Sequence, residues 1–231
     1  MKQFRLIFLL LLSATALRGM DSDDEMSQRA ETSLTIQEKE VRIPGAYFSH
    51  PLPGQPTIKE ALLYCIHNEQ EGIKAANYRL THYAFAQAMQ ERMAQKVTVS
   101  LIVDKEFHKE FCHGLHLLIK QGARVHCDTD RPYENTHHKF FIFQKNKNDK
   151  KALVVGSFNI TGQAVERNRE DVVILDDPFL IAQYEQYFES FKQSSRPITR
   201  AECRAAASKV IEKKSDQSKK INEIPSNYQF N

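Results

Sequence analysis

Short apolar runs alternate with longer amphipathic segments along the central part of the chain, and this alternation sets the fold class. The short runs have the composition of strands, and the longer segments repeat apolar residues three and four positions apart, as helices do. Strands separated by helices of about ten or more residues indicate crossover connections. The sequence therefore predicts a single α/β domain, with a mixed, mostly parallel sheet and helices on both faces. The predicted strands are 41–48, 72–80, 97–103, 124–126, 137–143, 152–158 and 171–175, and the predicted helices are 57–67, 83–95, 106–120 and 179–192.

The length of the chain limits it to one domain with tails. Of its 231 residues, 41% are hydrophobic, which is enough to fill one core. We place this domain at residues 41–195. The formal net charge of +3 permits an anionic partner without requiring one.

The N-terminus has the pattern of an export signal. Lys2 and Arg5 precede the apolar run 6–12, and the small residues at 14–16 form a cleavage site. This run is shorter than the about 20 apolar residues that a bilayer-crossing helix needs. We expect residues 1–16 to be a cleaved signal peptide, so that the chain is periplasmic or secreted and keeps no permanent membrane span. The alternative is a chain anchored to a membrane by an uncleaved N-terminal segment.

The segments that flank the domain have the composition of flexible regions. Residues 17–40 are polar, with no sustained apolar period, and we interpret them as a linker. Residues 196–231 are rich in Lys, Ser, Asn and Gln, and we expect a basic tail that is partly helical or disordered. A solvated tail is the simpler interpretation, and contact of its lysines with phosphates or lipid head groups is the alternative.

Four cysteines are present, and none of them has the CxxC spacing: Cys65, Cys112, Cys127 and Cys203. In an exported protein they allow up to two disulfides by any of three pairings. Cys65 falls on the apolar side of a predicted helix, which fits a buried free thiol equally well.

One segment has the spacing of metal ligands. His108, Cys112 and His116 lie four residues apart on one predicted helix, which aligns them along one side. They sit at the margin of the face that carries the apolar residues of that helix. We therefore predict no metal site and no cofactor.

The chemically distinctive residues lie on two predicted strands. His137 and Lys139 are two positions apart on the first, and Ser157 and Asn159 are two positions apart on the segment that ends the second. Because side chains alternate along a strand, each pair shares a face. If the two strands are neighbours, an imidazole, an ammonium, a hydroxyl and a carboxamide come together. Such a cluster suits a phosphodiester, since one group attacks and the others bind the oxygens on which charge develops.

The same residues resemble the signature of the phospholipase D superfamily. That signature is HxK, then GSxN, then Asn-x-Glu, and here it is met by His137 and Lys139, by the run 156–159, and by Asn168 and Glu170. The segments 46–51, 75–81 and 99–104 also look like the opening strands of that family. The resemblance covers about residues 45–192 and implies a phospholipase D-like fold.

The resemblance also implies a role for each residue. His137 would attack phosphorus and hold a covalent phosphohistidine, Lys139 and Asn159 would bind the phosphoryl oxygens, and Ser157 would assist. Glu170 would accept a hydrogen bond from the His137 ring. Gly156 is either a strand glycine or a point of close approach to the substrate. Such a site needs no metal ion.

The resemblance finally implies an assembly and a substrate class. A second histidine must protonate the leaving oxygen, and members with one HxK motif obtain it by forming homodimers across a two-fold axis. The substrate is a nucleic acid or a phospholipid, and the small, mildly basic domain favours nucleic acid.

One residue departs from the pattern, because Gln144 stands where the family has Asp. By strand alternation Gln144 faces away from His137, with His138. A catalytically inactive homologue that binds phosphate or nucleic acid remains the alternative.

Overall fold

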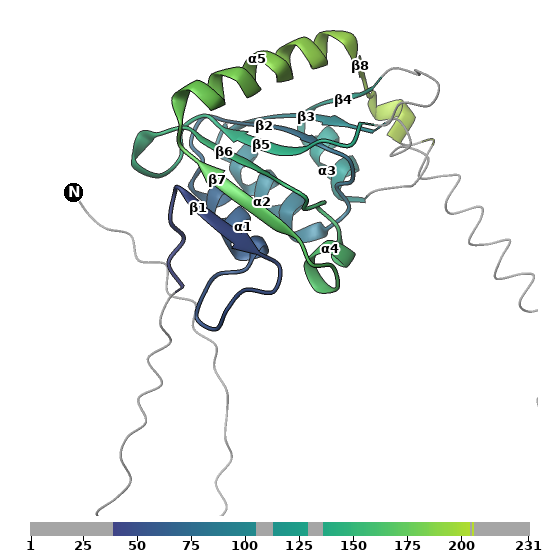
Figure 1. The fold of residues 1–231 in the computed structure, drawn as a ribbon. Coiled ribbons are helices and arrows are strands. Elements are labelled where there is room, and N and C mark those ends of the chain that lie inside the picture. Colours follow the sequence, from purple (N-terminus) through teal and green to yellow (C-terminus); the bar gives the residue numbers. More distant parts are fainter. Residues whose placement is uncertain (1–38, 105–112, 129–135, 204, 206–231) are drawn as a thin grey trace, which may run out of the picture. The chain divides into compact units, whose positions relative to one another are not determined.

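A computed structural model describes residues 39–104, 113–128, 136–203 and 205. The chain divides into two units, 1–37 and 38–231, and all the described residues belong to the second. They form one open sheet with helices on both faces (Figure 1). The proposed signal peptide and nearly all of the proposed linker lie outside the described residues.

The order of the predicted elements is confirmed, and most boundaries move by a few residues. Two short helices and a short strand were not predicted: η2, α4 and β8. Residues 105–112 of the predicted third helix lie outside the described residues. The elements are β1 (Gly45–Phe48), α1 (Ile58–Asn68), β2 (Gly72–Asn77), α2 (Tyr83–Ala94), β3 (Thr98–Val103), α3 (His113–Gln121), β4 (Arg124–Cys127), β5 (Lys139–Phe143), η2 (Lys147–Asp149), β6 (Ala152–Gly156), α4 (Gly162–Glu166), β7 (Asp171–Leu175), α5 (Pro178–Ser194) and β8 (Arg196–Pro197).

The strands are ordered β1-β7-β6-β5-β2-β3-β4-β8. β2 pairs parallel with β3, and β3 with β4, whereas the other five pairings of the described sheet are antiparallel. The predicted mixed α/β class is confirmed, but the expectation that the sheet is mostly parallel is wrong. The connections explain the difference. Crossover helices separate β2, β3 and β4, whereas β5, β6 and β7 follow one another through loops and short helical turns, which lets neighbouring strands run in opposite directions.

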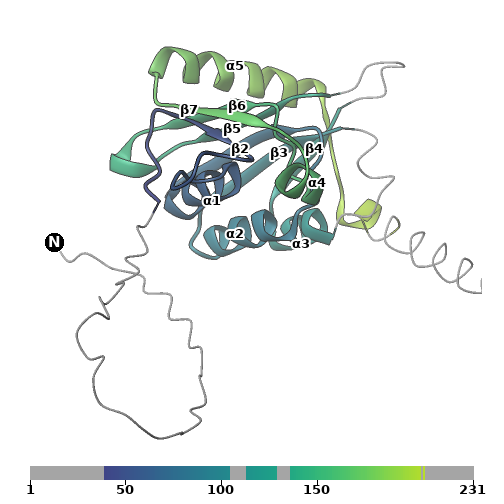
Figure 2. The same cartoon turned by 60° about the horizontal axis from the view of Figure 1, so that its bottom comes forward.

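The predicted helices on both faces are confirmed. Figure 2 shows α5 on one face of the sheet and α1, α2 and α3 on the other. The larger core cluster fills the side of α1, α2 and α3, and a smaller one packs beneath α5 around Phe140, Ile181 and Phe188. α1 begins with a capping box between Thr57 and Glu60, and the Asp177 side chain caps α5, which satisfies exposed N–H groups of the first turns.

The fold continues past residue 195, where we had placed the end of the domain. β8 pairs with β4 at the edge of the sheet, and Ile198 is buried against the larger core. Residues 200–203 are helical. The first residues of the proposed tail are therefore part of the folded unit.

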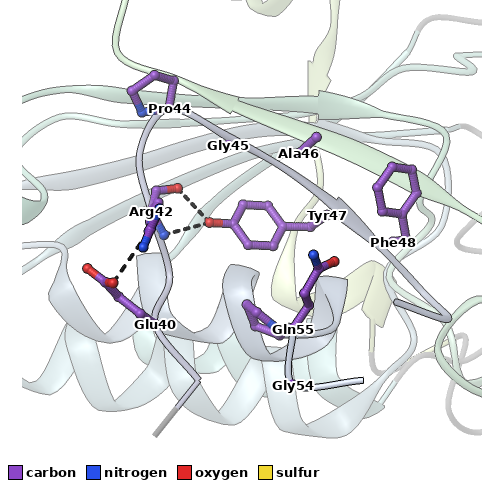
Figure 3. A pocket seen from close by; sticks show the side chains of 10 residues that line it. Glu40, Arg42, Pro44, Gly45, Ala46, Tyr47, Phe48, Gly54 and Gln55 are labelled. Atoms are coloured by element: carbon purple, nitrogen blue, oxygen red, sulfur yellow. Dashed lines mark hydrogen bonds and ion pairs between the residues drawn. The ribbon is translucent and has the colours of Figure 1, made fainter. Parts of the chain in front are cut away.

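A pocket of about 430 Å³ lies beside edge strand β1 (Figure 3). The Tyr47 hydroxyl accepts a hydrogen bond from the Arg42 backbone N–H at 2.7 Å and donates one to the Arg42 carbonyl at 2.5 Å. The charged residues of its lining, Glu40 and Arg42, pair with each other at 3.4 Å. The hydrogen bonds of Tyr47 with Arg42 fix the segment that precedes β1. None of the residues proposed for catalysis lines this pocket.

Cys65 and Cys203 are free thiols, Cys127 is buried in the core, and Cys112 lies outside the described residues. Burial raises the pKa of the Cys65 thiol to about 12, as expected of a cysteine that packs as an apolar side chain. None of the helices in the described ranges combines the length and the apolar character that a membrane crossing requires.

Candidate active site

The ends of four neighbouring strands, β2, β5, β6 and β7, lie side by side along one end of the sheet, which we call the His137 edge. Asn77, at the end of β2, pairs with Lys139, at the start of β5. Gly156, at the end of β6, pairs with Val172 near the start of β7. Because β5, β6 and β7 alternate in direction, the start of β5, the end of β6 and the start of β7 lie at the same edge. The structure thus brings the two predicted clusters, around Lys139 and around Ser157, to one place.

His137 and Lys139 contact each other at this edge. The Lys139 ammonium lies 3.1 Å from Nδ1 and 3.3 Å from Nε2 of the His137 ring, and it donates to the His137 carbonyl at 2.9 Å. Tyr78 packs beside them, with its ring centroid 4.9 Å from that of His137 and 5.7 Å from the Lys139 nitrogen. The side chain of His137 is exposed, so its imidazole is accessible to a substrate.

Lys139 is half-buried, and this has an electrostatic consequence. Burial lowers the pKa of its ammonium, and the negative charge of Glu170 opposes the change. Glu170 is therefore close enough to Lys139 to act on it electrostatically. A cation held in this way suits the binding of phosphoryl oxygens.

Ser157, Asn168 and Glu170 form a second group of contacts. The Glu170 carboxylate accepts a hydrogen bond from the Ser157 hydroxyl and another from Asn168 Nδ2 at 2.8 Å. Within the described residues, the ring of His137 bonds to Lys139 and not to Glu170. The expected hydrogen bond between His137 and Glu170 therefore stays a prediction.

Asn159 is partly buried and contributes a carboxamide whose oxygen is shielded from solvent. Its Oδ1 has no hydrogen-bond partner in the described part of the chain, and neither does Nδ2 of Asn77. The two residues lie close together, because the N–H of Ile160 bonds to Asn77 Oδ1 at 3.5 Å. Buried polar groups without a protein partner are rare, and at a binding site they are the groups that a ligand or a water satisfies.

Gly156 is required by the backbone of β7. A Cβ at this position would lie 2.1 Å from the Asp171 carbonyl oxygen and 2.7 Å from the Val172 Cα. Of the two interpretations, the structure supports that of a strand glycine, because the neighbouring strand approaches closely at this position. A contact of Gly156 with substrate stays a prediction.

Ser49 is a residue that sequence reasoning did not assign to the site. Its hydroxyl donates to the Asn168 carbonyl at 2.7 Å and accepts from the Glu170 N–H at 2.9 Å, and its own N–H donates to the Glu170 carbonyl at 3.0 Å. These three bonds fix the segment that carries Glu170. The only sequence signal was that Ser49 falls in a segment resembling the family.

The segment before His137 is also held by residues that we had not singled out. Asp104, buried at the end of β3, accepts from the Thr136 N–H at 2.8 Å, and Asp128 accepts from the Thr136 hydroxyl at 2.8 Å. On the other side of the strand, His138 bonds to the Tyr187 hydroxyl of α5 at 2.8 Å. Burial and the charge of Lys139 lower the pKa of His138, so its neutral form is favoured.

Gln144 lies on the α5 face of the sheet, on the side of His138. Its amide lies near the Glu185 carboxylate of α5. Burial raises the pKa of that carboxyl, but the hydrogen bonds from the Lys151 ammonium at 2.8 Å outweigh burial and lower it. This position agrees with the expectation from strand alternation. His108 and Cys112 of the predicted metal spacing lie outside the described residues, and no three His, Cys, Asp or Glu side chains within the described ones are grouped as a metal site.

The structure thus groups an imidazole, an ammonium, a hydroxyl and a carboxylate at one end of the strands of an α/β sheet, and comparison with known proteins gives the family of the chain. The family model described as "Cardiolipin synthase, PLD-like domain" matches residues 62–192, more than half of the chain. The chain therefore belongs to the phospholipase D-like family, as its motifs indicated.

Curated relatives carry two different names. The chain is 28% identical over 173 residues to the mitochondrial cardiolipin hydrolase of Canis lupus familiaris, with 72% of this chain and 65% of that protein covered. It is 31% identical over 130 residues to a phospholipase D of Rickettsia conorii, with 56% of this chain and 62% of that protein covered. The chain thus spans less than two thirds of the length of these relatives.

Solved structures agree on the fold. Nuc from Salmonella typhimurium, a phospholipase D family member, matches with a TM-score of 0.58 at 19% identity and covers 67% of this chain and 97% of its own. NucT from Helicobacter pylori matches with a TM-score of 0.53 at 22% identity, over 60% of this chain and 89% of its own. At this level of identity the likeness concerns the fold alone.

Proposed function

We propose that the chain is a phosphoric diester hydrolase that acts through a covalent phosphohistidine. A nitrogen of the His137 ring attacks phosphorus, a P–N bond forms, and the P–O bond to the leaving alcohol breaks. Water then attacks the phosphorus, the P–N bond breaks, and a phosphomonoester is released. Lys139 and the Asn159 amide bind the non-bridging oxygens, whose charge builds during both steps. Ser157 and Glu170 support the same region.

The observation that supports this proposal most is the exposed imidazole of His137 in contact with the Lys139 ammonium, 3.1 Å away, in a chain of the phospholipase D-like family. A nucleophile must be accessible, and it must lie beside a cation that attracts phosphate. His137 meets both requirements, whereas the adjacent His138 is bonded to Tyr187 and turned towards α5.

We further propose that two chains form one complete site. The leaving oxygen needs a proton, and His137 of the partner subunit is suited to supply it and, once neutral, to accept the proton of the attacking water in the second step. Near the site, Phe48 is 47% exposed and Val173 is 37% exposed, and these apolar side chains are of the kind that subunit interfaces bury. The arrangement would be isologous, so both subunits would present the same surface.

For the substrate we propose nucleic acid, with phospholipid as the alternative. The groups around His137 recognise only the phosphate, so both classes fit the chemistry. Plasmid DNA, RNA and phosphatidylcholine vesicles, each offered to the same preparation, distinguish them. Degradation of vesicles without degradation of either nucleic acid would overturn the preference.

The activity itself is tested with bis(p-nitrophenyl) phosphate in the presence of EDTA. We expect turnover by the native chain and a loss of roughly 10³-fold or more for His137→Gln, because the nucleophile is removed. The neighbouring variant His138→Gln is the matched control and should keep activity within about tenfold. No turnover by the native chain, or equal turnover by His137→Gln, would reject the proposal.

The alternative of an inactive binding protein rested on Gln144. Since that residue lies on the α5 face with Glu185, its identity gives no reason to expect a damaged His137 site. Binding of an oligonucleotide without any hydrolysis in the same assay would favour the alternative.

A further inference from the structure

A second concave site lies on the α5 side of the sheet, at the other end of β2 from the His137 edge. It has a volume of about 330 Å³, within the range of small-ligand pockets. Its described lining includes four cationic side chains and one carboxylate: Lys74, Lys96, Arg124, Lys192 and Glu189. Lys74 is three residues before Asn77 on β2, about 10 Å along the strand, so this cavity is separate from the proposed catalytic site.

The cavity has an excess of positive charge. Glu189 pairs with both Lys74 and Lys192, each at 3.0 Å, and this triad connects β2 to α5. Lys96 and Arg124 are exposed at the rim, and within the described residues neither forms an ion pair. Two cations are therefore left for an anion, beyond those that stabilise the packing of α5.

The floor of the cavity carries a polar group without a protein partner. Ser100 lies on β3, and its hydroxyl is buried with no hydrogen bond to the described residues. On the adjacent strand, the Nδ1 atom of His126 is likewise buried and unpartnered. Burial and the charges of Lys192 and Arg124 lower the pKa of His126, while Glu189 opposes them, which agrees with a net positive potential here.

We propose that this cavity is a second anion site, which binds the dianionic phosphate group of a phosphomonoester. The two unpaired cations match the charge of that group, and Ser100 can donate to one of its oxygens. Volume favours a small ester over an extended polymer. The proposal uses no residue of the His137 site and does not depend on hydrolysis by that site.

Inorganic phosphate and glycerol 3-phosphate are the probes, and calorimetry at neutral pH on the full chain is the measurement. The background variant His137→Ala/Lys139→Ala weakens binding at the other site, and we expect saturable binding to persist in it. Adding Lys96→Gln and Arg124→Gln to this background should raise Kd at least tenfold. These two side chains are exposed, so their replacement leaves the core intact.

The matched control removes the same charge elsewhere. Lys59→Gln/Lys147→Gln changes α1 and the turn before β6, away from the cavity, and should alter Kd less than twofold. An equal loss in both double variants would mean general attraction of anions and would reject the site. Absence of saturable binding in the His137→Ala/Lys139→Ala background would also reject it.

Two further measurements make the assignment local. Anion binding should raise the pKa of the His126 ring, which an NMR titration measures. If this pKa is the same at saturation as without the anion, the anion binds elsewhere. Phosphatidylcholine vesicles with and without phosphatidic acid test whether the phosphate is presented by a lipid surface. If the chain binds the vesicles that contain phosphatidic acid but does not bind glycerol 3-phosphate, the proposal of a site for small phosphomonoesters is rejected.

Discussion

The parallel and the antiparallel parts of the sheet carry their polar side chains differently. In β2 and β3 most residues are buried, and the polar residues nearest the His137 site lie at or just after the carboxyl ends of β2, β3 and β4 as Asn77, Asp104 and Asp128. There they hold neighbouring loops. Other polar residues of these strands, such as Lys74 and Ser100, line the second cavity. In β5, β6 and β7 the polar residues sit where one strand starts or ends, and Lys139 and Glu170 are only partly buried.

The difference follows from how the strands are connected. A crossover helix returns the chain to the same end of the sheet, so parallel strands place equivalent ends together and bury their middles. Antiparallel neighbours place the start of one strand beside the end of the next. The antiparallel part therefore collects the reactive groups, and the parallel part supplies their support.

The largest expected effect on stability concerns the contact between β6 and β7 in the antiparallel part. Gly156→Ala would place a methyl group 2.1 Å from the Asp171 carbonyl, and we expect a loss of about 3 kcal/mol in the free energy of unfolding. Chemical denaturation measures it. The control is Gly162→Ala, where a Cβ meets nothing within 4 Å and the change should be below about 1 kcal/mol. Similar stabilities of the two variants would show that β7 can move away without cost.

The buried carboxylate of Glu69 joins the two parts of the sheet. It accepts a hydrogen bond at 2.8 Å from the N–H of Gly72, the first residue of β2, and another at 2.9 Å from the N–H of Lys145, which follows β5. Glu69→Gln presents an amide N–H₂ to these donors, and we expect a loss of about 2 kcal/mol. Exposed Glu71→Gln should change stability by less than about 0.5 kcal/mol in the same denaturation series. Equal effects would mean that the Glu69 bonds do not hold the two parts together.

Ser49 tests whether the Glu170 segment needs support from β1. Ser49→Ala removes two of the three bonds to residues 168–170, and we expect a fall of about tenfold in kcat with KM nearly unchanged, since Glu170 becomes less well positioned. Ser49→Thr should restore most of the rate, and Ser194→Ala is a neutral control. A loss of stability without a change in kcat would make Ser49 purely structural.

The smallest expected effect concerns His138 and its contact with α5. Its pKa is lowered in the folded protein, so the unfolded chain binds the proton more readily. The stability that this histidine contributes is present above its ordinary pKa of 6.5 and is lost as the pH falls below that value. Unfolding free energies between pH 7.5 and 5.5 should therefore fall less steeply for His138→Gln than for the native chain. Parallel curves would remove His138 from the set of titrating groups.

Much of the fold was accessible from local patterns. The order of strands and helices followed from apolar periodicity, because burial on one side of an element repeats with that element's own period. The site motifs were equally local: His137 and Lys139 stand at the start of β5, and Ser157 and Asn159 follow β6. Alternation also placed Gln144 on the face opposite His137.

The direction of the strands was not accessible in this way. Periodicity reports which side of a strand is buried but not which strand lies beside it, and the expectation of a mostly parallel sheet failed for that reason. The sequence also left two interpretations of Gly156, a strand glycine or a close approach of the substrate. In the structure the backbone of β7 lies against this glycine.

The sequence by itself determined the family, the order of the elements and the residues that carry the proposed chemistry, since each depends on side chains only a few positions apart. Tertiary structure alone decided what those residues contact. Ser49 meets Asn168 and Glu170 across separations of 119 and 121 residues, and Lys96, Arg124 and Lys192 line one cavity from distant parts of the chain. Such contacts depend on how distant segments pack, and no local repeat of residue types records that packing.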